Sequence, residues 1–101
     1  MSASSGPAEL PIARRYLISG RVQGVYYRAS AAQRARAAGI TGHARNLPDG
    51  RVEVIACGSH RVLVEFMAWL RIGPAAAKVS DIVVEELELS LEQLPQQFRS
   101  V

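Results

Sequence analysis

The chain has 101 residues, with 12 Lys and Arg against 9 Asp and Glu, a net charge of +3, and 49% hydrophobic residues. This length allows one domain with a small core, and the composition excludes a largely disordered chain. The single cysteine excludes an internal disulfide and a cysteine-pair zinc site. No segment is long enough to span a membrane and the start does not resemble a secretory signal, so we expect a cytoplasmic protein without a membrane partner. The positive charge favours anionic partners but does not separate a phosphorylated metabolite from a nucleic acid.

A tail, a strand and a loop are predicted at the start of the chain. Residues 1–13 are rich in Ser, Ala, Gly and Pro, which favours a disordered N-terminal tail, so the domain is expected to span residues 14–101. The short apolar segment 15–19 favours a β-strand that ends at Gly20. The residues that follow are expected to form a loop interrupted by Gly24.

A helix is predicted over residues 28–38, whose sequence RASAAQRARAA is rich in strong helix formers. One face carries residues at helical spacing and is expected to be buried; its members are Tyr27, Ala31, Ala35 and Ala38. Gly39 follows at the position where a glycine commonly ends a helix.

A β-hairpin is predicted next, with strands over residues 41–46 and 51–57. The residues between them, Leu47-Pro48-Asp49-Gly50, form a turn sequence in which Pro presets φ and Gly accepts a positive φ. Alternate residues of the second strand are expected to face the core, namely Val52, Val54 and Ala56.

A second helix is predicted after Ser59, a favoured N-cap residue, and Gly73-Pro74 is expected to end it. Its buried face is predicted to contain Val62, Leu63, Phe66 and Leu70. Residues 79–87 favour a strand, and a short edge strand is predicted near Phe98. The order β-α-β-β-α-β, with this fifth C-terminal strand, predicts an α+β fold of the ferredoxin-like, split βαβ type, in which two helices cover one face of an antiparallel sheet.

The loop before the first helix has the features of an anion-binding site. Gly20 and Gly24 allow successive main-chain N–H groups to converge, and a helix N-terminus adds a partial positive charge. Arg28 supplies a planar guanidinium that can bond two phosphate oxygens at once. From spacing alone, the alternative is a tight connection in which the glycines serve geometry and Arg28 is a solvated helix residue. The loop is neither a Walker A motif nor a G-x-G-x-x-G motif.

Two segments resemble the motifs of a known family. Residues 20–28, GRVQGVYYR, closely resemble the signature loop of the acylphosphatase family, and residues 42–53, GHARNLPDGRVE, resemble its second motif. The resemblance extends over residues 14–87 and implies a ferredoxin-like fold and hydrolysis of the carboxyl-phosphate bond of a small acyl phosphate, with no metal and no cofactor. Many family members have Gly or Phe at the position of Tyr26, where a positive φ would strain a tyrosine.

The resemblance also implies the roles of individual residues. By motif position, the family's catalytic arginine falls on Arg28 and its catalytic asparagine on Asn46. The main-chain amides implied in phosphate binding are those of Gln23, Gly24, Val25, Tyr26, Tyr27 and Arg28. The amide side chain of Asn46 can orient a water molecule but is not a base. Turn chemistry alone also explains Asn46, because Asn is favoured at the first position of a turn.

Two other functions are open on the sequence alone. A nucleic-acid-binding ferredoxin-like module would fit the fold and charge, but residues 51–57 lack the aromatic platform of RNA-recognition strands, so no specific nucleic-acid partner is expected. A non-catalytic phosphate-binding accessory domain is the other alternative, because acylphosphatase-like domains also begin larger carbamoyl-transfer maturation enzymes. We expect a stand-alone monomeric enzyme. His43, His60 and Cys57 show no metal-ligand spacing and are predicted to be packing or surface residues.

Overall fold

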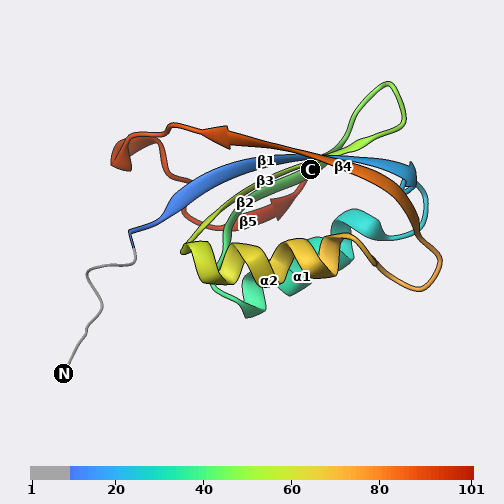
Figure 1. The fold of residues 1–101 in the computed structure, drawn as a ribbon, viewed down its shortest axis with the longest axis horizontal. Coiled ribbons are helices and arrows are strands. Elements are labelled where there is room, and N and C mark those ends of the chain that lie inside the picture. The colour runs from blue at the N-terminus through green and yellow to red at the C-terminus, as the bar shows by residue number, and fades with distance from the viewer. Residues whose placement is uncertain (1–9) are drawn as a thin grey trace.

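The computed structural model describes residues 10–101, which form a five-stranded sheet with two helices on one face (Figure 1). In chain order the elements are β1 (Ile12–Arg21), α1 (Tyr27–Ala37), β2 (Thr41–Asn46), β3 (Val52–Gly58), α2 (His60–Leu70), β4 (Lys78–Leu87), the short 3-10 helix η2 (Leu91–Gln93) and β5 (Phe98–Ser100). The predicted α+β ferredoxin-like fold is confirmed, including the C-terminal strand. Residues 1–9 of the predicted tail lie outside the described residues, and residues 12 and 13 belong to β1.

The strand directions bring three carboxyl ends to one end of the sheet. The strand order is β4-β1-β3-β2-β5. Both β1 and β2 are antiparallel to β3, which makes them parallel to each other, and β5 pairs in parallel with β2. The sheet is therefore mixed rather than purely antiparallel. The loop after β1, the turn after β2 and the end of β5 consequently lie at the same end of the sheet (Figure 1).

The core lies between the sheet and the helices. Alternate residues of β1 and β3 are buried against α2, as the pattern of β3 predicts, and this set contains Tyr16, Ile18, Val52, Val54, Ala56, Leu63, Phe66 and Leu70. The rings of Tyr16 and Phe66 meet edge to face, with their centroids 6.5 Å apart. Burial of each large apolar side chain contributes about 1.5–3 kcal/mol, so this layer is the main stabilising feature. Val62, predicted to be buried, is half-buried at the margin of α2.

The buried face of α1 differs from the predicted one by a single residue. Tyr27, Ala31 and Ala35 are buried as expected, and Ala32 joins them. Ala38 is exposed instead, because the helix ends at Ala37 and Ala38 is its C-cap. The hydroxyl of Tyr27 donates a hydrogen bond to the main-chain oxygen of Leu70 at 2.6 Å, which joins α1 to the end of α2.

Gly20 does not end the first strand, as the sequence had suggested, but occupies an irregularity within it. The register between β1 and β4 shifts between Ser19 and Gly20, and β1 continues to Arg21. Gly20 has a φ of +121°, and a Cβ atom there would lie 2.1 Å from the main-chain oxygen of Lys78. A side chain cannot fit this close approach, which explains the need for glycine.

Candidate active site

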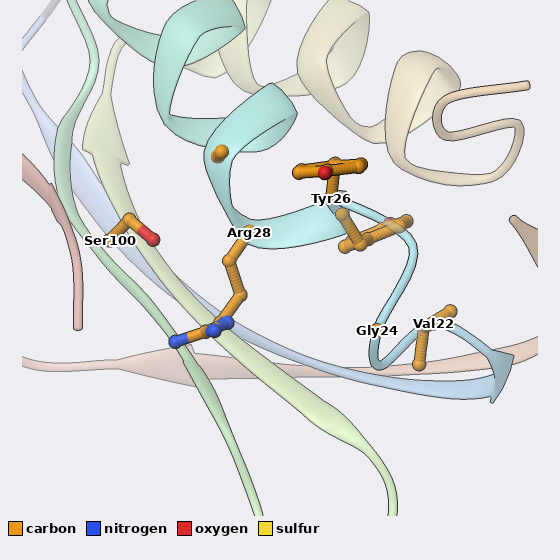
Figure 2. Close-up of a pocket in the computed structure, with 7 residues that line it drawn as sticks. Val22, Gly24, Tyr26, Arg28 and Ser100 are labelled. Atoms are coloured by element: carbon orange, nitrogen blue, oxygen red, sulfur yellow. The ribbon is translucent and has the colours of Figure 1, made fainter. Parts of the chain in front are cut away.

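A pocket of about 340 Å³ opens where β1 passes into α1. Its lining comes from the predicted anion loop, the first turn of α1 and β5, and comprises Val22, Gly24, Tyr26, Tyr27, Arg28, Ala29 and Ser100 (Figure 2). Segments that are distant in the sequence thus meet in one concavity at the carboxyl end of β1.

The main chain of the loop leaves the start of α1 open to an anion. Gly24 has a φ of +75° and Tyr26 a φ of +64°, so the chain turns twice through the left-handed region before the helix begins. Tyr26 is the N-cap residue, no side chain caps this helix, and its first turn contains no acidic residue. The first N–H groups of a helix have no partner within the helix. Without a side-chain cap they can donate to a bound phosphate, which the helix dipole also attracts.

Arg28 lies in the first turn of α1 and lines the same pocket. Figure 2 shows its side chain extending away from the helix, with Ser100 on one side in this view and Gly24 on the other. One guanidinium nitrogen, Nη1, donates to the main-chain oxygen of Val101. Among residues 10–101 no side-chain carboxylate forms an ion pair with Arg28. The guanidinium can therefore serve an incoming anion.

Asn46 lies at the same end of the sheet but outside the pocket lining. It is the last residue of β2, and its side chain is exposed. Because β1 and β2 run parallel, Asn46 lies at the end of the sheet from which the Arg28 loop departs. The arrangement leaves Asn46 open to solvent water at the edge of the site.

Gln23 joins the Arg28 loop to the turn after Asn46. Its Nε2 atom donates to the main-chain oxygens of Leu47 and Arg51, each at 2.9 Å. The same Arg51 oxygen accepts the Leu47 N–H at 2.8 Å, so Gln23 completes the closure of the β2–β3 turn. One side chain thus holds the two predicted halves of the site together. Neither Gln23 nor Val25 lines the pocket.

Comparison with known proteins identifies the family. The Acylphosphatase family model matches residues 14–99. The chain belongs to the acylphosphatase family. An acylphosphatase from Methylococcus capsulatus is 50% identical over 76 residues, which cover 75% of this chain and 83% of that protein. One from Alkalilimnicola ehrlichii is 48% identical over 86 residues, covering 85% and 93% of the two chains. The crystal structure of acylphosphatase from Bacillus subtilis superposes with a TM-score of 0.82 at 36% identity, covering 89% of this chain and 98% of that one.

The sequence predicted the C-terminal strand of this acylphosphatase domain, but its contribution to the pocket was missed. Ser100 lines the pocket and Val101 accepts the hydrogen bond from Arg28. The predicted edge strand near Phe98 was the available signal, but its place beside β2 depends on pairing across the sheet. The role of Gln23 was also missed, because its side-chain partners lie 24 and 28 residues further along the chain.

The histidines and the cysteine of the sequence analysis lie outside the pocket lining. His43 bonds the carboxylate of Glu53 through Nε2 at 3.0 Å, and His60 contacts Arg14. Cys57 is buried, and this burial raises the pKa of its thiol, as expected for a packed residue.

Residues 10–101 contain no group of three or more His, Cys, Asp or Glu side chains arranged to hold a metal ion. In the same part of the chain, no helix combines the length and apolar character that crossing a bilayer requires.

Glu53 is the centre of a charge cluster on the sheet face away from the helices. It is 4% exposed, and its carboxylate accepts hydrogen bonds from Arg15 at 2.8 Å and from Arg45 at 2.6 Å as well as from His43. Burial opposes ionisation of Glu53, but these three hydrogen bonds outweigh it and lower its pKa to about 2. The charges in this cluster are paired with one another, whereas Arg28 bonds the main-chain oxygen of Val101 and has no side-chain carboxylate partner among residues 10–101.

Proposed function

We propose that the chain hydrolyses the carboxyl-phosphate bond of small acyl phosphates, releasing a carboxylate and inorganic phosphate. Arg28 and the main-chain amides of residues 23–28 bind the phosphate, and Asn46 positions the attacking water. One observation carries this proposal: an arginine without a side-chain carboxylate partner shares a pocket with a helix start that has no side-chain cap. Membership of the acylphosphatase family supports it.

The chemistry requires little beyond these groups. The leaving carboxylate has a conjugate acid with a pKa of about 4, so no strong general acid is needed at neutral pH. The barrier comes mainly from negative charge on the phosphoryl oxygens and from placing water in line. Arg28 and the converging amides stabilise that charge more as it builds up in the transition state than in the bound substrate.

Asn46 addresses the second part of the barrier. Its side-chain oxygen can accept a hydrogen bond from the water while its NH₂ donates to a neighbouring group, which fixes the direction of attack. The pocket lining contains no carboxylate and no imidazole to act as a base. We therefore assign one proton of the attacking water to a phosphate oxygen of the substrate. Cleavage of the bond between phosphorus and the acyl oxygen then releases the carboxylate and dihydrogen phosphate, which loses a proton to solvent at neutral pH.

We also propose that the enzyme is a metal-independent cytoplasmic monomer without a specific nucleic-acid partner. Positive charge for the reaction comes from Arg28 and main-chain donors, so we propose metal-independent hydrolysis. All proposed site residues belong to one chain, which fits a monomer, and the buried Cys57 thiol fits a reducing cytoplasm. On the sheet face away from the helices, β3 presents Glu53, Ile55 and Cys57, which form no aromatic platform for nucleic-acid bases.

Release of inorganic phosphate from benzoyl phosphate, with and without a metal chelator, tests the activity. We expect hydrolysis that the chelator leaves unchanged. Failure to release phosphate from benzoyl phosphate and from acetyl phosphate would contradict the proposed function, and inhibition by the chelator would contradict the metal-independent mechanism.

The variant Asn46→Ala tests separately whether Asn46 positions the water rather than binding the phosphate. This substitution is expected to lower kcat by about 100-fold, because the water loses its orientation. Inhibition by inorganic phosphate, measured as its competitive inhibition constant, should be nearly unchanged, since the phosphate ligands are intact. A variant that lost phosphate inhibition together with turnover would show that Asn46 binds the phosphate instead.

A further inference from the structure

The side chain of Tyr26 stands at the rim of the pocket and is largely unburied. It is 83% exposed, although it lines the same concavity as Arg28. The other large apolar side chains of the lining, Val22 and Tyr27, are each 1% exposed. A large aromatic ring left in water beside a binding pocket gains nothing from burial in the free protein.

The main chain at Tyr26 is also a poor place for a tyrosine. Its φ of +64° lies in the left-handed region, which glycine adopts without strain and which an aromatic residue rarely adopts. Among residues 10–101, no other aromatic ring contacts the Tyr26 ring, and its hydroxyl forms no hydrogen bond. Neither core packing nor local conformation therefore accounts for a tyrosine here, and the ring is free to contact a ligand.

The position of the Tyr26 ring suits contact with the acyl group of the substrate, which the phosphate ligands do not hold. Arg28 and the loop amides grip the phosphate end, so the acyl group must extend from the phosphate toward the mouth of the pocket. Tyr26 precedes Arg28 by two residues and lines the same pocket (Figure 2), and its 83% exposure places its ring on the solvent side of that pocket. The remaining exposed members of the lining are the small residues Gly24, Ala29 and Ser100, which offer little apolar surface.

We propose that Tyr26 binds the acyl end of the substrate and gives the enzyme a preference for acyl phosphates with a flat, apolar acyl group. This inference rests on the proposed function, because it concerns the same pocket and the same bond. An aromatic acyl group would stack on the exposed ring and remove both surfaces from water. A small acyl group such as acetyl would leave the ring exposed and gain no such contact.

The test compares two substrates that share the phosphate and differ in the acyl group. The values of kcat/KM for benzoyl phosphate and for acetyl phosphate are measured for the wild type and for Tyr26→Gly, which suits the positive φ. We expect the ratio of benzoyl to acetyl kcat/KM to fall by about tenfold in the variant, mainly through a higher KM for benzoyl phosphate. Tyr26→Phe keeps a ring without the hydroxyl and should retain the wild-type ratio.

A second variant separates loss of the ring from loosening of the loop. Tyr26→Asn has no ring but tolerates the left-handed conformation, so it should show the same reduced ratio as Tyr26→Gly. An unchanged ratio in both ring-free variants, or an equal fall for both substrates, would overturn the inference while leaving the proposed function intact. Absence of phosphate release from either substrate by the wild type would overturn the proposed function and this inference with it.

Discussion

The two helices begin in opposite ways, although each contains 11 residues and neither has an acidic residue in its first turn. Helix α2 starts conventionally, because Ser59 is its N-cap and its hydroxyl accepts a hydrogen bond from the Val62 N–H at 3.4 Å. Helix α1 starts at Tyr26 in a left-handed conformation, without a side-chain cap. The pocket lies at the start of α1, so the helix that departs from the usual capping rules is the one whose N–H groups face a potential ligand.

The arginines also differ in whether a side-chain carboxylate pairs with them. Arg15 and Arg45 share the buried carboxylate of Glu53, so their charges are matched within the protein. Arg28 has a main-chain oxygen as its partner and lines a pocket. Charges that are paired with each other stabilise the fold, whereas an arginine without a side-chain carboxylate partner is available to bind an anion.

The largest effect on activity is expected from substitution of Arg28, in the first turn of α1. Arg28→Ala should lower kcat/KM for benzoyl phosphate by about 1,000-fold and weaken inhibition by inorganic phosphate, because the guanidinium contacts the phosphoryl oxygens. Arg61→Ala is the matched control, since Arg61 is the second residue of α2 as Arg28 is of α1. The control should retain activity, and both variants should keep the wild-type circular dichroism spectrum. Equal losses in the two variants would remove the distinction between the two helix starts.

Removal of the Glu53 carboxylate, which pairs with basic side chains outside the pocket, should lower stability rather than activity. Glu53→Gln is expected to lower the free energy of unfolding by about 2 kcal/mol at pH 7, because three basic side chains lose their shared carboxylate. The pKa of Glu53 is lowered from its usual value of 4.5 to about 2. The contribution of the ionised carboxylate to stability is therefore fully present above the usual pKa and is lost as the pH falls from there to about 2. Urea unfolding at pH 7 and pH 3 should therefore show a smaller difference between the wild type and the variant at pH 3. A difference that is independent of pH would contradict this account, as would a large loss of activity at pH 7.

A smaller effect on catalysis is expected from Gln23, which joins the two halves of the site. Gln23→Ala removes both hydrogen bonds to the β2–β3 turn, so Asn46 should be held less firmly relative to the Arg28 loop. We expect kcat to fall by about tenfold, with a smaller change in the inhibition constant for phosphate. Gln33→Ala, on the exposed face of α1, is the control and should leave kcat unchanged. If phosphate inhibition fell more than kcat, Gln23 would act on the phosphate loop rather than on the placement of Asn46.

The smallest effect is expected at the conventional helix start. Ser59→Ala removes the cap of α2 and should lower the free energy of unfolding by about 0.5–1 kcal/mol in urea titration. Activity on benzoyl phosphate should remain at the wild-type level, because α2 contributes no residue to the pocket lining. A fall in kcat in this variant would mean that the start of α2 is coupled to the site.

Local sequence patterns predicted most of the fold correctly. Residues 41–46 form β2 as predicted, Ser59 caps α2, and Gly39 follows α1 with a φ of +75°. The errors lie where neighbours distant in sequence decide the outcome. Gly20 continues β1 because β4 pairs beside it, and the burial of Ala32 in place of Ala38 depends on where α1 ends against the sheet.

The sequence by itself predicted the order of the elements, because hydrophobic periodicity and turn chemistry are local properties of the chain. Its resemblance to two family motifs implied the family and the two candidate residues Arg28 and Asn46. Only the tertiary structure decided that Ser100 lines the pocket and that Val101 accepts the hydrogen bond from Arg28. It also decided that Gln23 links the Arg28 loop to the turn after Asn46, and that Tyr26 is exposed although it lines the pocket. Each of these facts depends on strand pairing or burial between segments that are far apart in the sequence. Such contacts form only when the sheet assembles, and no local pattern specifies them.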